Sequence, residues 1–269
     1  MFESVTEAPR PGAIRRLAAG AWHAPAGFGF LLVRPRLWPW AVLPAVVAVL
    51  GIVLGLVAGW MIAPTVQESV VPETWPPWLS LTAWFGVLAW TLFSGLVLGL
   101  ALALLLASPL LELLQCRVER LVIGSSPDAG HGVLRDVLES LRGALYFALA
   151  APFVFVIGLV PLLGPPLAAL WAANALAFQQ TDSPLGRRGR DFAARRRWHA
   201  TWRPESLGFG LAGLVTLVVP GVNLIAVPSL AVGAARLVIE LESIDSTGAE
   251  AVAEGAPRDP DPASGVSES

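Results

Sequence analysis

Long uncharged stretches of apolar residues alternate with short charged segments along this chain. Residues 37–67, 74–111, 143–181 and 206–235 contain no Asp, Glu, Lys or Arg. A helix needs about 20 apolar residues to cross roughly 30 Å of hydrocarbon, and all four stretches are longer than that. They are rich in Leu, Ala, Val and Gly without a two-residue alternation, so helices rather than a β-barrel must satisfy the backbone. The pattern therefore predicts an all-α integral membrane protein.

The first two stretches predict two long transmembrane helices, at about residues 41–63 and 81–107. The loop between them carries acidic residues and tryptophans but no Arg or Lys, as expected for a loop outside the cytoplasm. Beyond the second span, Glu112 and Glu119 mark an extension that we expect to face solvent on the cytoplasmic side.

The third and fourth stretches predict two re-entrant, hemi-penetrating helical hairpins, at about residues 146–178 and 207–238. Pro and Gly interrupt each stretch midway, at residues 161–166 and 220–221. Proline ends a helix, and each half of about 15 residues is then too short to cross the bilayer. We therefore expect hairpins that enter and leave on the cytoplasmic side, accompanied by amphipathic cytoplasmic helices. In the alternative, each half crosses a thinned bilayer obliquely, which gives six spans.

Composition and charge fit a membrane location and set the orientation. Of 269 residues, 55% are hydrophobic and 14% are charged, against roughly 45–50% and about 25% in an average soluble domain. All 18 basic residues are arginines, and most lie within residues 10–36, 117–142 and 187–203. Short loops that carry Arg stay in the cytoplasm. We therefore expect a multi-pass protein of the cell's inner membrane with cytoplasmic N- and C-termini.

The end of the chain differs from the rest in composition. Residues 243–269 are rich in Asp, Glu, Gly, Pro and Ser and hold few large apolar side chains. Such a segment buries too little apolar surface to offset the entropy of ordering. We therefore expect one membrane domain over residues 1–242 and a disordered acidic tail over residues 243–269.

Glycines recur at four-residue spacing in both predicted spans. They are Gly51, Gly55 and Gly59 in the first span and Gly95 and Gly99 in the second. One glycine face on each helix allows the two backbones to approach closely. The spacing predicts a specific helix pair or an oligomer contact, and the alternative is that these glycines face lipid.

Two further motifs suggest nucleotide or nucleic-acid binding only weakly. Gly208, Gly210 and Gly213 fit the pattern G-x-G-x-x-G, but no strand precedes them and no acidic residue follows at the distance that a ribose contact requires. The arginine run at residues 187–203 lies beside membrane stretches, where it is better suited to anionic lipid headgroups than to nucleic acid.

The chain also lacks the usual residue groupings of enzymes. His23, His131 and His199 are scattered without metal-ligand spacing, and no Ser, His and acid grouping or Cys-x-x-Cys pair is present. The apolar stretches hold no ionised side chain, which disfavours a proton-coupled pump. We expect no enzyme activity, no metal and no cofactor.

A set of short segments within residues 20–242 matches a known pattern in order and content. The segments are GFLLVRPRLW at 29–38, ASPL at 107–110, QQTDSP at 179–184, RRGR at 187–190, GFG at 208–210, VPGVNLIAVP at 219–228 and AVGAA at 231–235. They resemble the CysZ-type sulfate permeases, whose superfamily includes the etoposide-induced membrane proteins. The resemblance implies two long spans with hemi-penetrating hairpins, assembly as a homo-oligomer, and passage of sulfate for cysteine synthesis.

The resemblance also implies an anion-binding turn, and this chain departs from it. The family's turn reads Pro-Gly-Leu-Arg, whereas residues 35–38 read Pro-Arg-Leu-Trp, without the glycine and with the arginine displaced. We expect the anion to bind where this turn meets the hairpin breaks, because helix N-termini there present unpaired N–H groups. The expected substrate-binding residues are Arg34, Arg36, Leu37, Trp38 and Asn223.

Two functions from different classes stay open. The first is a permease or channel for sulfate or a similar oxyanion that supports sulfur assimilation. The second is a membrane scaffold or assembly factor that uses the same fold without conducting anything, because one fold serves several functions.

Overall fold

The computed structural model describes residues 11–72, 74–127, 133–219 and 223–255, and throughout these residues it contains helices and no strands. The all-α class is therefore confirmed. The elements are α1 (Ala13–Leu32), the short 3₁₀ helix η1 (Pro35–Leu37), α2 (Trp38–Val70), α3 (Pro77–Ile123), α4 (Val133–Gly158), α5 (Gly164–Arg187), α6 (Phe192–Thr201), α7 (Arg203–Val218) and α8 (Asn223–Gly255).

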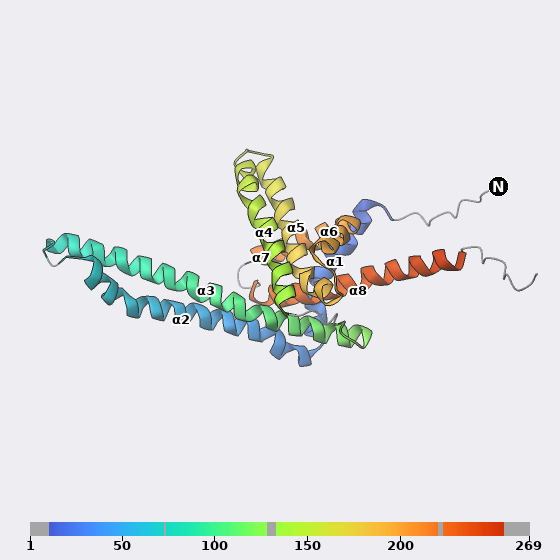
Figure 1. The fold of residues 1–269 in the computed structure, drawn as a ribbon, viewed down its shortest axis with the longest axis horizontal. Helices are drawn as coiled ribbons and strands as arrows, with labels where there is room; N and C mark the ends of the chain where they lie inside the picture. Colours follow the sequence, from blue (N-terminus) through green and yellow to red (C-terminus); the bar gives the residue numbers. More distant parts are fainter. Residues whose placement is uncertain (1–10, 73, 128–132, 220–222, 256–269) are drawn as a thin grey trace, which may run out of the picture.

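Helices α2 and α3 form a long antiparallel pair that projects from the rest of the molecule (Figure 1). Most of their large apolar side chains are exposed, which suits hydrocarbon and is unfavourable in water. Within the described residues, three segments are long and apolar enough to cross a membrane: Pro35–Val70, Pro77–Ile123 and Leu138–Gly158. The first two contain the two predicted spans, and the third overlaps the first predicted hairpin.

The glycines of the two predicted spans lie at the contact between α2 and α3. A Cβ atom on Gly51 would lie 2.6 Å from the carbonyl oxygen of Gly99, and one on Gly59 would lie 2.4 Å from that of Thr91. Gly55 and Gly95 approach each other in the same way. Since no side chain fits at these distances, the glycines let the two backbones touch over several turns.

Helices α4 and α5 form a second antiparallel pair, which leaves the body in a different direction from α2 and α3 (Figure 1). The chain turns at residues 159–163, where the sequence predicts a helix break at Pro161. The turn is strongly apolar, and Leu162 is 89% exposed at its tip. Exposed leucine at a loop tip is favourable in lipid and costs free energy in water. The re-entrant path of this hairpin stays a prediction.

The second predicted hairpin has a different environment, because α7 and α8 form the core of the body together with α1. Most of α8 between Ala226 and Leu241 is buried. Helix α7 has 16 residues, which gives roughly 24 Å and is shorter than the hydrocarbon core. In the described part of the chain, neither α7 nor α8 is among the segments long and apolar enough to cross a membrane, and both the hairpin and the six-span alternative stay predictions.

The G-x-G-x-x-G motif on α7 serves helix packing. A Cβ atom on Gly208 would lie 2.0 Å from the carbonyl oxygen of Leu17 in α1, and one on Gly210 would lie 1.9 Å from that of Ala173 in α5. The motif therefore lets α7 pack closely against two neighbouring helices.

Helix α8 continues through Gly255, so the first part of the segment 243–269 is helical although we expected it to be disordered. Several Ala and Glu residues in this part favour a helix. Residues 256–269 lie outside the described part of the chain.

Candidate anion site

The turn between α1 and α2 is held by its own backbone. The N–H of Arg34 donates to the carbonyl of Leu31 at 3.1 Å, and that of Leu37 donates to the carbonyl of Arg34 at 2.9 Å. Pro35 begins η1, where its fixed φ suits the first turn of a helix and its missing N–H costs nothing. The turn is therefore a defined structure at the start of the first long apolar helix.

Leu37 and Trp38 position this turn. Leu37 is 2% exposed and packs in an apolar cluster with Phe30, Leu114 and Val232, so its side chain cannot contact an ion. The indole N–H of Trp38 donates to the carbonyl of Leu31 at 2.9 Å, which uses the only donor of that side chain. Both residues, which we expected at the substrate, hold the turn in place through packing and a hydrogen bond.

Two arginines share one aromatic ring beside the turn. The guanidinium carbon of Arg34 lies 3.6 Å from the centroid of the Phe30 ring, and that of Arg236 lies 5.2 Å from the same centroid. Arg236 comes from α8 and donates from Nη1 to the carbonyl of Ala26 at 3.3 Å. Among the described residues, no carboxylate forms an ion pair with either arginine.

Arg36 and Arg117 add positive charge to the same border of the body. Arg36 is exposed at the turn. Arg117 of α3 stacks on Trp40, with its guanidinium carbon 3.5 Å from the ring centroid. The ion pairs among the described residues include neither arginine. Uncompensated arginines at a border between apolar and polar surface attract anions.

Asn223 and the first hairpin break are not brought to this turn. Asn223 begins α8, and its side chain lies outside the described atoms. Arg236 follows 13 positions later in the same helix, which corresponds to about 20 Å along the axis. The break at residues 159–163 lies at the far end of the α4 and α5 pair (Figure 1). One ion held at Arg34 therefore does not touch Asn223 or that break.

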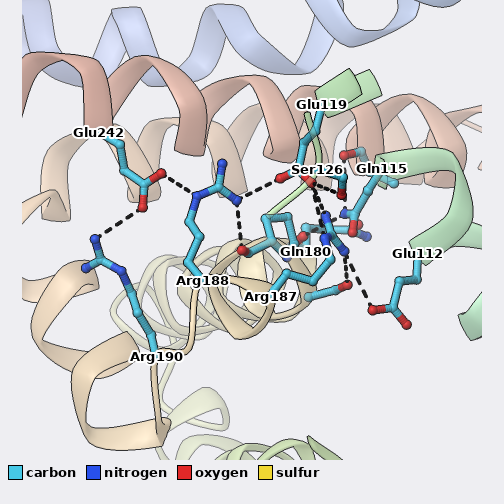
Figure 2. Close-up of polar contacts among 12 residues, drawn as sticks. Glu112, Gln115, Glu119, Ser126, Gln180, Arg187, Arg188, Arg190 and Glu242 are labelled. Atoms are coloured by element: carbon cyan, nitrogen blue, oxygen red, sulfur yellow. Dashed lines mark hydrogen bonds and ion pairs between the residues drawn. The ribbon is translucent and has the colours of Figure 1, made fainter. Parts of the chain in front are cut away.

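A buried ion-pair network lies on the other side of the α3 extension, and the sequence did not indicate it. Figure 2 shows Glu119 between Arg187, the last residue of α5, and Arg188, which follows it. Its Oε2 accepts from Nε and Nη2 of Arg187 at 3.1 and 2.9 Å, and its Oε1 accepts from Nη1 of Arg188 at 2.7 Å. Glu119 is fully buried, so our expectation that it faces solvent is wrong. Its hydrogen bonds offset the cost of burying its charge.

The same network continues to α8. Glu242 accepts from Nε of Arg188, and its second oxygen accepts from Nη2 of Arg190 at 3.2 Å. Arg187 also lies 3.6 Å from Glu112. Because each of these arginines has a carboxylate partner, the network joins α3, α5 and α8 and offers little charge to a free anion (Figure 2).

Comparisons with known proteins agree with the expected class. The model of the family "Sulfate transporter CysZ/Etoposide-induced protein 2.4" matches residues 24–228. The sulfate transporter CysZ of Pseudomonas syringae pv. tomato is 29% identical over 180 residues, which cover 61% of this chain and 70% of the relative. That of Pseudomonas fluorescens is 29% identical over 143 residues, 49% of this chain and 57% of the relative. The latter match thus spans little more than half of its relative.

Proposed function

Because the chain belongs to the sulfate transporter CysZ/etoposide-induced protein 2.4 family, we propose that it is a permease or channel for sulfate or a similar oxyanion. Two relatives carry the name sulfate transporter, which supports sulfate transport at the level of the family. In this proposal the protein lies in the inner membrane as a homo-oligomer with both termini in the cytoplasm, and it supplies sulfur assimilation.

One observation carries the assignment of the anion site. Arg34 precedes η1 and Arg36 lies within it, directly before α2, and neither arginine has a carboxylate partner among the described residues. The helix N-terminus adds roughly half a positive charge to the two arginines. A charge-assisted hydrogen bond from Arg to an oxyanion is about twice as strong as a neutral one. The turn can therefore concentrate an oxyanion at the membrane border.

The proposed path beyond this turn is neutral. Residues 37–67, 74–111 and 206–235 contain no charged side chain that could carry a proton with the substrate. A proton-coupled carrier usually holds such a group inside the membrane. These features favour passage down a gradient. We propose that Asn223 contacts the anion at a second position, where the N-terminus of α8 is available as a partner.

Isothermal titration of the purified full chain with sulfate tests the site. We expect Arg36→Ala and Arg34→Ala each to weaken sulfate binding by about tenfold, the value of one charge-assisted hydrogen bond. Arg197→Ala is the matched control, because Arg197 is an exposed arginine on α6. Unchanged affinity in both turn variants would contradict this site, and absence of oxyanion binding by the unmodified chain would favour the scaffold function.

A further inference from the structure

Helix α8 supplies an arginine to the anion site that neither the sequence nor the family resemblance indicated. We propose that Arg236 and Arg34 form a two-armed clamp that binds one oxyanion beside the ring of Phe30. This inference rests on the proposed function and adds a residue to the same site. Its ligand is a tetrahedral oxyanion with at least two accessible oxygens, such as sulfate or a phosphate group.

The geometry allows both arginines to reach one ion. Each guanidinium carbon lies near the centroid of the Phe30 ring, at 3.6 Å for Arg34 and 5.2 Å for Arg236, so the two carbons are within about 9 Å of each other. Hydrogen bonds from guanidinium nitrogens to charged oxygens measure about 2.7–2.9 Å. In the proposed bound state the two side chains rotate so that one tetrahedral oxyanion accepts hydrogen bonds from both guanidinium groups.

The positive charges at this place are not balanced by a carboxylate among the described residues. Arg16, Arg187, Arg188 and Arg195 all form ion pairs with carboxylates. Arg236 has no such partner among the described residues although it is half-buried. The ring face of Phe30 and one carbonyl compensate the charges only weakly, and the two cations repel each other. A dianion between them replaces this repulsion with two attractive contacts.

A hydrogen bond to α1 orients the Arg236 side chain before any ligand arrives. Nη1 of Arg236 donates to the carbonyl of Ala26 in α1. One turn earlier on α8, a Cβ atom on Gly233 would lie 2.4 Å from the carbonyl oxygen of His23, so α1 and α8 are in backbone contact there. A site formed by rigid neighbouring helices loses little entropy when its ligand binds. Binding at the clamp therefore joins the turn after α1 to α8, the helix that begins at Asn223.

Two sources of oxyanion can reach the clamp. Val33 at the end of α1 and Trp38 at the start of α2 are exposed beside it, and in this proposal the clamp lies at the border of the membrane. A free sulfate ion and the phosphate of a lipid headgroup present the same oxygens at this border. Separate measurements with sulfate and with lipid distinguish the two sources.

The test uses the full chain in detergent and substitutes Arg236→Met, which keeps the apolar stem and removes the charge. We expect sulfate binding, measured by calorimetry, to weaken by at least about tenfold in Arg236→Met, the value of one charge-assisted hydrogen bond. The Arg34→Met variant should match it, and the double variant should lose less than the product of the two, because the arms share one ion. Arg197→Met is the matched control, since Arg197 is an exposed arginine on α6, a helix that supplies no residue to the clamp, and we expect a change below about threefold.

A second measurement identifies the source of the anion. In nanodiscs of phosphatidylglycerol, a headgroup in the clamp would compete with sulfate and weaken its binding relative to phosphatidylcholine nanodiscs, and Arg236→Met would abolish this difference. If Arg236→Met does not fold, as judged by its melting temperature without ligand, Arg236→Lys keeps the charge without the two-pronged geometry and should weaken binding by severalfold.

The outcomes separate this inference from the proposed function. If Arg236→Met binds sulfate and phosphatidylglycerol like the unmodified chain while Arg36→Ala loses sulfate binding, the clamp is wrong and the proposed function stands. If the unmodified chain binds neither sulfate nor an anionic headgroup, both fail. If phosphatidylglycerol alone binds through Arg236, the clamp stands as a lipid site and sulfate transport loses its support from this residue.

Discussion

Gly55 of α2 and Gly95 of α3 face each other so closely that a Cβ atom on either would lie 2.1 Å from the carbonyl oxygen of the other. No side chain fits at that distance, so the two predicted spans are joined backbone to backbone within one chain. The glycine faces of these spans are consequently occupied. A homo-oligomer, which we propose, must use other surfaces of α2 and α3 or other helices.

The first prediction concerns this contact. The substitution Gly55→Leu forces α2 and α3 apart, and we expect a loss of at least about 3 kcal/mol in the free energy of unfolding, the upper range for overpacking. Gly86→Leu is the matched control in the same helix pair, because a Cβ atom at Gly86 would meet no atom within 4 Å apart from its chain neighbours and the backbone of its own helix. Thermal unfolding in detergent measures both. Equal melting temperatures for the two variants would show that the contact between the helices is absent.

The second prediction concerns the buried network at Glu119. Glu119→Gln leaves Arg187 and Arg188 without the charge that both contact, and removal of one member of a buried ion pair typically costs about 3–5 kcal/mol. Glu112→Gln is the control, since Glu112 is 51% exposed and lies 3.6 Å from Arg187, and exposed pairs contribute about 0–1 kcal/mol. Chemical unfolding in mixed detergent should separate the variants. A similar small loss in both would mean that the network is open to water.

The third prediction concerns acid sensitivity. Burial lowers the pKa of His199 on α6 to about 4 from its usual 6.5. Between these two values the unfolded chain binds a proton that the folded chain does not, so stability falls as the pH is lowered from 6.5 to 4, by at most about 3 kcal/mol. The ring stacks on Phe178, and its Nε2 lies 2.9 Å from Oγ1 of Thr181.

The variant His199→Phe tests this effect, because it keeps the stacking and cannot titrate. Oγ1 of Thr181 still donates to the carbonyl of Ala177 at 2.8 Å, so no buried donor is left unpaired. We expect melting temperatures of the unmodified chain to fall more steeply between pH 7 and pH 5 than those of the variant. Parallel pH profiles would show that His199 is solvated in the folded protein.

Much of the fold could be predicted from the sequence, because its signals are local. The two spans follow from charge-free stretches and the break at Pro161 from proline chemistry. The burial of Glu119 could not be predicted in this way, since its partner Arg187 is 68 residues away and Glu on an amphipathic extension usually faces water. Only the path of the chain brings them together.

The residues of the candidate site likewise fall into two groups: those that the sequence indicated and those that only the structure brings to the site. The turn at Arg34 was found through the resemblance of its neighbours to a family pattern, whereas Arg236 gave no signal, because one arginine at the end of an apolar stretch looks like a membrane boundary. Its position over Phe30 depends on how α8 crosses α1. Asn223 was expected at the site because it begins a helix whose N-terminus presents unpaired N–H groups to an anion, but 13 positions of α8 separate it from Arg236.

The fourth prediction concerns orientation in the membrane. In a Cys116→Ser background, a cysteine at position 197, which is exposed on α6, should react with a membrane-impermeant reagent only after cells are opened. A cysteine at position 78, exposed in the first turn of α3 next to the acidic loop, should react in intact cells. Labelling of position 197 from outside would contradict both the cytoplasmic arginine run and the hairpin interpretation of residues 146–178.

Sulfate flux in liposomes that contain the purified chain tests the central proposal most directly. The account predicts that sulfate leaves loaded vesicles faster with the protein than without it, and that Arg36→Ala slows this flux by about tenfold while Arg197→Ala leaves it nearly unchanged. Flux equal to that of protein-free vesicles, from a chain shown by its melting transition to be folded, would contradict the proposal that this protein conducts an oxyanion.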